Sequence, residues 1–141
     1  MKVTLTNYEI ENFLNVIGHQ ESFRNNVGIK IPFNLDWALR VNIKKLTDRY
    51  SVINDARNDL NKSFLESDKV EENGVDIKKE YIEEYVSTLS QIMSQKNEFD
   101  FETVDSEVLK NPALEMLSMP ERDFLNIMVK DEDKNEKETT E

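Results

Sequence analysis

Residues 39–64 read LRVNIKKLTDRYSVINDARNDLNKSF, and this stretch decides the fold. Apolar side chains recur in it at alternating spacings of four and three residues, which is the heptad pattern of a helix that packs along one stripe. The stripe consists of Leu39, Ile43, Leu46, Tyr50, Ile53, Leu60 and Phe64, with Arg57 in the one remaining position. Asn34 can cap the start, so the pattern predicts a helix over residues 35–66, about 48 Å long at roughly 1.5 Å per residue.

A second helix is predicted to pack against the first. Asn73-Gly74 is a turn signal, and Asp76 can cap a helix that runs to about residue 96. Its apolar stripe is Ile82, Tyr85, Leu89 and Ile92. Helices joined by a short polar loop pack antiparallel, so we expect a helical hairpin at about residues 35–96. The second helix is the shorter one, so the start of the first, including Trp37 and Leu39, must be covered by the rest of the domain.

Short elements flank the hairpin on both sides. Alternating apolar residues predict strands near residues 3–5, 27–31 and 99–103. Thr6-Asn7-Tyr8-Glu9 and Ser118-Met119-Pro120-Glu121 have the form of capping boxes, and each is followed by an apolar stripe at helical spacing. Gly18 suits the end of the first of these helices, and Asn111-Pro112 predicts a short helical turn through Leu117.

The whole pattern predicts one α+β domain over residues 1–130, with a two- or three-stranded sheet, short helices and a projecting hairpin. The size fits a single core, because 141 residues are too few for two. Residues 131–141 contain no apolar side chain, so we expect a disordered acidic tail.

Charge excludes one class of partner. The net charge is −11, and residues 1–68 are neutral, with nine acidic and nine basic side chains, so the acidity lies in the later part of the chain. A protein that binds bare nucleic acid needs clustered Lys and Arg to neutralise phosphates. We therefore expect no direct nucleic-acid binding. An acidic face can instead meet a basic protein surface or imitate a phosphate backbone.

No catalytic residue, cofactor or metal site is predicted. The chain has no cysteine, and its single histidine, His19, has no second histidine to complete a metal set or a nucleophile–base pair. Glu80, Glu83 and Glu84 could share a cation, but they read better as the solvent face of the hairpin, since Lys79 lies among them. No segment has the roughly 20 apolar residues that cross a bilayer, so no membrane association is expected.

Two surfaces are candidates for binding a partner. One is acidic and consists of Asp100, Glu102, Asp105 and Glu107. The other lies on the shorter hairpin helix, where Tyr81, Val86 and Met93 form a second apolar stripe that the domain body or a second copy must cover. Arg57 is either a partner-binding residue or, as we prefer, one half of an ion pair with Glu83 or Glu84 that fixes the hairpin register.

Three segments carry a resemblance. They are residues 1–10 (MKVTLTNYEI), residues 27–33 (VGIKIPF) followed by residues 42–46 (NIKKL), and the helix that opens with Ser118-Met119-Pro120-Glu121. Together they resemble a family of small uncharacterised proteins of phages and prophages of Gram-positive bacteria. The resemblance covers the chain to about residue 130, and it implies a phage gene product that acts in the bacterial host cytoplasm or in a virion.

These observations give two functional hypotheses. The first is a non-enzymatic phage protein that binds and modulates a host protein, for example as an inhibitor of a defence or nucleic-acid enzyme. The second is a virion or tail-assembly component, which would bind phage proteins or form a homo-oligomer.

Overall fold

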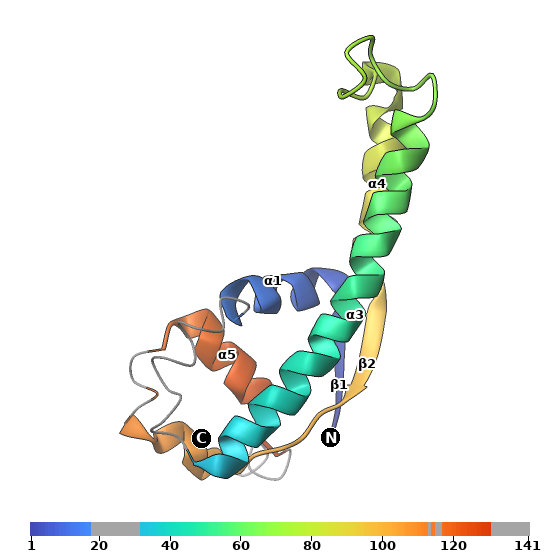
Figure 1. Ribbon diagram of the computed structural model, residues 1–141. Coiled ribbons are helices and arrows are strands. Elements are labelled where there is room, and N and C mark those ends of the chain that lie inside the picture. Colours follow the sequence, from blue (N-terminus) through green and yellow to red (C-terminus); the bar gives the residue numbers. More distant parts are fainter. Residues whose placement is uncertain (18–31, 113, 115–116, 131–141) are drawn as a thin grey trace.

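The computed structural model describes residues 1–17, 32–112, 114 and 117–130. The chain forms an α+β fold with a two-stranded antiparallel sheet and a long projecting hairpin, which confirms the predicted class (Figure 1). The elements in chain order are β1 (Lys2–Thr6), α1 (Asn7–Ile17), α3 (Phe33–Leu65), η1 (Lys79–Tyr81), α4 (Ile82–Met93), β2 (Lys96–Asp100), η2 (Ser106–Lys110) and α5 (Met119–Ile127). The predicted strand at 27–31, the Gly18 cap, His19 and the tail at 131–141 lie outside the described residues.

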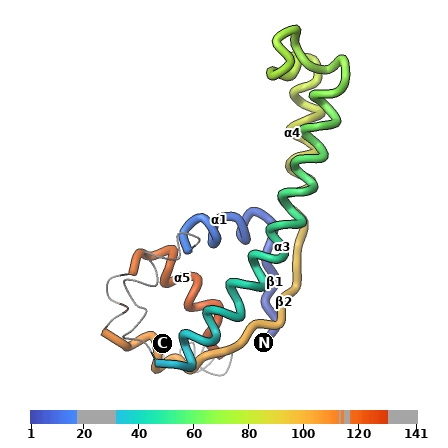
Figure 2. The backbone as a smooth tube through the Cα atoms, in the orientation of Figure 1, coloured from blue at the N-terminus to red at the C-terminus, as the bar shows by residue number. Residues whose placement is uncertain are grey.

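Helix α3 joins the two parts of the molecule. Its 33 residues span about 50 Å at roughly 1.5 Å per residue. One end lies in the domain body beside α1, α5 and the sheet, and the other end forms an arm with α4 (Figures 1 and 2). The predicted cap at Asn34 is wrong, because Pro32 holds the N-cap position and its carbonyl accepts from the backbone of Leu35 and Asp36.

The body is built around the first half of α3. Leu35, Leu39 and Leu46 are buried there, so the predicted cover for this overhang is present. It comes from the sheet and from α1 and α5, which contact each other through the rings of Phe13 and Phe124, 5.4 Å apart. Trp37 is the exception, because it is 52% exposed, and among the described residues its one ring partner is Phe33.

The sheet pairs the start of the described chain with the segment that leaves the hairpin. β1 and β2 are antiparallel, with Val3 opposite Phe99. The third strand, predicted near residues 99–103, is β2, which begins at Lys96 and ends at Asp100. The backbone N–H of Asn7 donates to the carbonyl of Gln95, which fixes the chain between α4 and β2 against the start of α1.

Both predicted capping boxes form. In the first, the Glu9 amide donates to Thr6 Oγ1, and the Thr6 amide donates to the Glu9 carboxylate. In the second, Ser118 and Glu121 make the same two bonds. After β2, Val104 bridges to Val129 in parallel, which closes the body behind α5.

The loop of the hairpin is more structured than predicted. Gly74 adopts a φ of +73°, as an Asn-Gly turn requires, and Val70 bridges to Ile77. The predicted cap at Asp76 is wrong, because the Asp76 amide donates to Asn73 Oδ1 inside this turn. The second helix therefore begins only after the bridge, with η1 and then α4, and it ends at Met93 rather than near residue 96.

Candidate protein-binding surface

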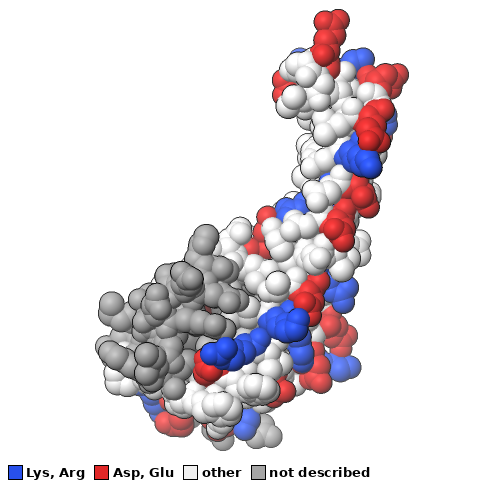
Figure 3. Space-filling model, viewed as in Figure 1, with Lys and Arg blue, Asp and Glu red and all other residues white. Residues whose placement is uncertain are grey.

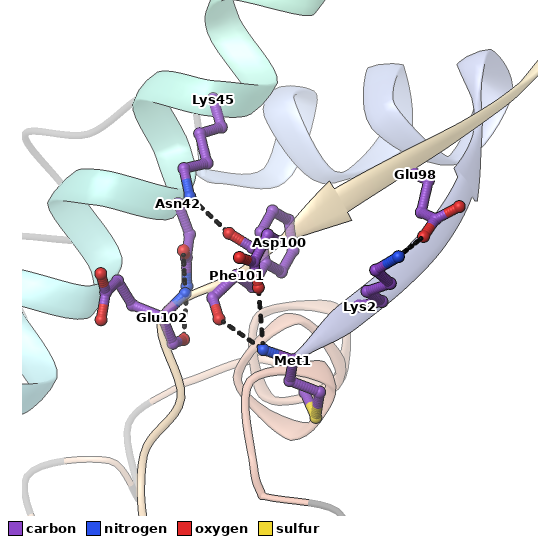
Figure 4. A network of polar contacts seen from close by, with 8 residues as sticks. All are labelled: Met1, Lys2, Asn42, Lys45, Glu98, Asp100, Phe101 and Glu102. Atoms are coloured by element: carbon purple, nitrogen blue, oxygen red, sulfur yellow. Dashed lines mark hydrogen bonds and ion pairs between the residues drawn. The ribbon is translucent and has the colours of Figure 1, made fainter.

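The predicted acidic face begins at the last residue of β2, Asp100, and ends at Glu107 in η2. Its first part is held by contacts within the molecule (Figure 4). The ammonium group of Met1 donates to Asp100 Oδ1 at 3.0 Å, and Lys2 pairs with Glu98 on the neighbouring position of the sheet. The hydrogen bond and the positive charge of the ammonium group hold the pKa of the Asp100 carboxyl below its usual value. Lys45 Nζ also donates to the Asp100 carbonyl. Asp100 is thus already partnered, although its side chain is 82% exposed.

Two of the three remaining acidic candidates also have a cationic partner. Asp105 pairs with Lys130 at 2.9 Å, and Glu107 pairs with Lys110 at 3.1 Å. Within the described part of the chain, Glu102 alone of the four makes no ion pair, while its backbone is held by Asn42. Asp100 and Glu102 are exposed and Phe99 and Phe101 are buried, as the alternation predicts. The face exists, but most of its charge is neutralised locally.

Arg57 is a structural residue at the base of the arm. The predicted pairing with Glu83 or Glu84 is wrong, because Arg57 Nη1 lies 3.0 Å from both carboxylate oxygens of Glu11 on α1. Its Nη2 donates to Tyr50 and Asn54. Burial lowers the pKa of Arg57, but the bonds to Glu11 and Tyr50 outweigh it, so the pKa is raised. Arg57 therefore fastens the arm to α1, not α3 to α4.

The three apolar candidates on the hairpin have different surroundings. Met93 is only 2% exposed and belongs to the core, so its assignment to a binding surface is wrong. Tyr81 is half-buried, and its ring lies 5.6 Å from Lys69 Nζ. Val86 is 54% exposed, as predicted for a surface residue. The body therefore covers Met93, Lys69 partly covers Tyr81, and Val86 between them stays in solvent.

Ile82 belongs to the exposed stripe as well, although the sequence pattern placed it in the hairpin seam. It is 46% exposed and lies one turn before Val86. The two side chains line an open groove of about 800 Å³ along the outer face of α4, and Ser87, Ser90 and Ser94 continue it toward the body. The spacing of four residues between Ile82 and Val86 could have indicated this face, but it competes with the three-four-three pattern of the seam.

The end of the arm beside this groove is strongly acidic. Residues 66–84, here named the arm tip, hold eight carboxylates and three lysines. Glu66 pairs with Lys62, and Glu84 pairs with Lys69. The other six carboxylates make no ion pair with any described residue: Asp68, Glu71, Glu72, Asp76, Glu80 and Glu83. Figure 3 shows the acidic side chains gathered at the free end of the arm.

The packing inside the arm holds the tip in place. The rings of Phe64 and Tyr85 meet edge to face at 5.3 Å, and Lys69 Nζ lies 5.0 Å from the Phe64 ring. Tyr85 also donates to Asn61 across the two helices. The arm tip is therefore a fixed surface, in which exposed apolar groups lie next to unpaired negative charge.

Two other kinds of site are absent from the described residues. In the described ranges no three His, Asp or Glu side chains lie close enough to hold a metal ion, and no helix there is long and apolar enough to cross a membrane. Comparison with protein-family models, with curated proteins and with solved structures finds no match for the chain. The surface geometry is therefore the basis for any functional assignment.

Proposed function

We propose that this chain is a non-enzymatic phage protein that binds a host protein through the arm and modulates it in the host cytoplasm. The observation that carries the proposal is the juxtaposition on the arm of exposed Ile82 and Val86 with six carboxylates that make no ion pair with a described residue. Apolar area gives affinity when it is buried, and unpaired charge at its edge steers the encounter and selects the partner. The partner is a protein with basic residues around an apolar contact.

The acidic face formed by Asp100, Glu102, Asp105 and Glu107 is the weaker candidate for the same role. Asp100, Asp105 and Glu107 already have cationic partners at 3.0, 2.9 and 3.1 Å. A basic partner would have to replace these contacts, whereas at the arm tip it would meet carboxylates without one. The phage origin rests on the resemblance of residues 1–10, 27–33, 42–46 and 118–121.

The experiment starts from an affinity pull-down with host lysate. The affinity and association rate of the captured partner are then measured with the wild type and with two variants of the arm. Val86→Asp with Ile82→Asp removes the apolar contact, and Glu71→Gln with Glu72→Gln and Glu80→Gln removes unpaired charge from the tip. The first variant should weaken binding at least tenfold. The second should slow association and reduce its dependence on salt.

Matched controls lie on the body. Met119 is 68% exposed, so Met119→Asp tests an exposed apolar residue away from the arm. Asp105→Asn with Glu107→Gln tests acidic side chains that are already paired. Both controls should bind like the wild type. If Asp105→Asn with Glu107→Gln weakens binding and the arm variants do not, the acidic face of Asp100, Glu102, Asp105 and Glu107 is the binding surface. Recovery of phage structural proteins alone, or of a second copy of the chain, would instead favour the assembly component.

A further inference from the structure

A second pocket lies at the base of the arm, where α3, the end of α4 and the starts of α1 and β2 meet. Its volume is about 400 Å³, which is within the range of small-molecule sites. It shares no residue with the groove on α4. The floor is apolar and includes Ile53, which is 2% exposed, together with Ile92, while Val52 stands at the edge with 57% of its surface exposed.

The rim of this pocket is basic. Arg49 and Lys96 line it, and the described residues that form the lining include no aspartate or glutamate. This is unusual in a chain with 29 acidic and 18 basic side chains. The pocket is thus a local exception to the charge of the molecule.

Neither Arg49 nor Lys96 has an ion-pair or hydrogen-bond partner for its side chain among the described residues. Every other lysine and arginine in the described ranges, apart from Lys78 and Lys79, takes part in an ion pair or hydrogen bond through its side chain. Two of the four cations without a partner therefore line one small pocket. Arg49 and Lys96 are both exposed, so an anion in solution can reach either charge, and the guanidinium group can bind a carboxylate or a phosphate in a bidentate way.

The back wall of the pocket is fixed by hydrogen bonds. Asn7, which is 6% exposed, donates from its side-chain amide to the Ile92 carbonyl at 2.6 Å. Asn97 donates to Asn7 Oδ1 at 2.7 Å and to the Leu5 carbonyl. These bonds hold the end of α4 and the start of β2 together, so the pocket does not depend on a ligand for its shape.

We infer that this pocket binds a small organic anion, with a carboxylate or phosphate head held between Arg49 and Lys96 and a short aliphatic tail on the floor formed by Ile53 and Ile92. The planar guanidinium matches either head with two parallel hydrogen bonds, and the ammonium adds a third donor. The tail covers Val52 and displaces water from the floor. This site is independent of the proposed partner-binding arm.

The test is a titration of the full chain followed by amide NMR. Hexanoate and hexyl phosphate are the probes for the two heads, hexanamide is the neutral control, and inorganic phosphate is the control without a tail. At least one of the two probes should shift the amides of residues 49–56 and 92–97 in a saturable way. Hexanamide and inorganic phosphate should bind at least tenfold more weakly.

Three variants separate this site from general charge effects. Arg49→Gln with Lys96→Gln should weaken the bound probe at least tenfold. Lys78→Gln with Lys79→Gln removes the same charge from the other two unpartnered cations and should leave binding unchanged. Ala56→Leu fills the pocket while both cations stay, and it should also abolish binding.

Several results would overturn the assignment. They are the absence of saturable shifts with both probes, equal binding of hexanamide, equal losses in the two charge variants, or unchanged binding in Ala56→Leu. Capture of a host protein by the arm does not enter this test, so failure here leaves the proposed function standing.

Discussion

Asn42 is a buried polar side chain, with no exposed surface, in the middle of the hydrophobic part of α3. Its side-chain amide donates to the Glu102 carbonyl at 3.0 Å, and its Oδ1 accepts from the Glu102 amide at 2.9 Å. The pairing of β2 with β1 ends at Asp100, and the Asn42 side chain supplies the hydrogen bonds of the Glu102 backbone just beyond it. A buried backbone group without a partner is costly, so Asn42 connects the sheet to the long helix at a position where an apolar side chain could not.

Replacing Asn42 by alanine should therefore destabilise the protein by about 2–4 kcal/mol, since two backbone groups lose their partner and a cavity forms. Chemical denaturation measures the change. Asn58 is the matched control, because it lies on the same helix, is exposed, and its side chain makes no hydrogen bond to any described residue. Asn58→Ala should change the free energy of unfolding by less than about 0.5 kcal/mol. Equal effects would show that the Glu102 bonds contribute nothing.

The pairing of Arg57 is tested by removing the charge of its acid. Glu11→Gln should destabilise the protein by about 1–3 kcal/mol, because the hydrogen bonds to a charged group that is about three-quarters buried are weakened. Glu83→Gln, at one of the two acids predicted to pair with Arg57, should have almost no effect. The opposite order in thermal or urea unfolding would restore the pairing between the two hairpin helices.

At the scale of elements, the apolar seam between α3 and α4 is buried near the body and only partly buried further along the arm. Ile53 is buried at the base of the arm and belongs to the same core as Met93, whereas Leu60 and Tyr50 in the same stripe are only half-buried. The seam thus depends on a few residues near the junction with the body. Further out, ring contacts such as that between Phe64 and Tyr85 replace a continuous core.

Ile53→Asp places a charge in this seam without a partner and should cost about 3 kcal/mol or more. The neighbouring Val52 provides the control, since it is 57% exposed on the same turn of α3. Val52→Asp should stay within about 1 kcal/mol of the wild type. Circular dichroism during thermal unfolding distinguishes the two, and a wild-type melting curve for Ile53→Asp would refute the buried seam.

The elements that the sequence predicted well are those specified by local chemistry. The capping boxes at Thr6 and Ser118 form because the bonds join residues three apart, and the long stripe on α3 needs only its own periodicity. The Asn73-Gly74 turn is equally local. Where one short-range rule dominates, the pattern alone is enough.

Two errors, at Arg57 and Met93, arose where a distant segment changed the local preference, and the error at Asp76 arose from a competing contact nearby in the chain. Arg57 binds Glu11, which is 46 residues away in the chain, and no heptad position indicates that contact. Asp76 could cap a helix, but the bridge between Val70 and Ile77 delays the start of that helix. Met93 follows the exposed stripe in sequence and is buried because the body meets the arm there. The candidate surface was therefore predictable at Val86 and not at its lower end.

At the scale of the whole molecule, burial is distributed unevenly along one continuous helix. Leu35, Ala38, Leu39, Ile43 and Leu46 are buried in the first half of α3, while Ile53 and Phe64 are the buried residues of the second half. Local stability follows the amount of apolar surface that an element buries. The arm therefore has less to hold it folded than the body has.

Native-state hydrogen exchange should report this difference within a single helix. Amides of residues 38–46 should exchange close to the rate set by global unfolding, and amides of residues 58–64 should exchange earlier through opening of the arm. Both stretches have the same helical hydrogen bonds, so each serves as the reference for the other. Equal protection along α3 would show that arm and body unfold as one unit.

One consequence of the continuous α3 is mechanical. The helix crosses from body to arm with no proline or glycine after Pro32, so it has no pivot at the junction. A force applied at the arm tip is therefore transmitted along α3 to the body. The contacts that resist it are the bonds of Arg57 to Glu11 and of Asn42 to Glu102. A partner that grips the tip thereby sets the orientation of the whole body.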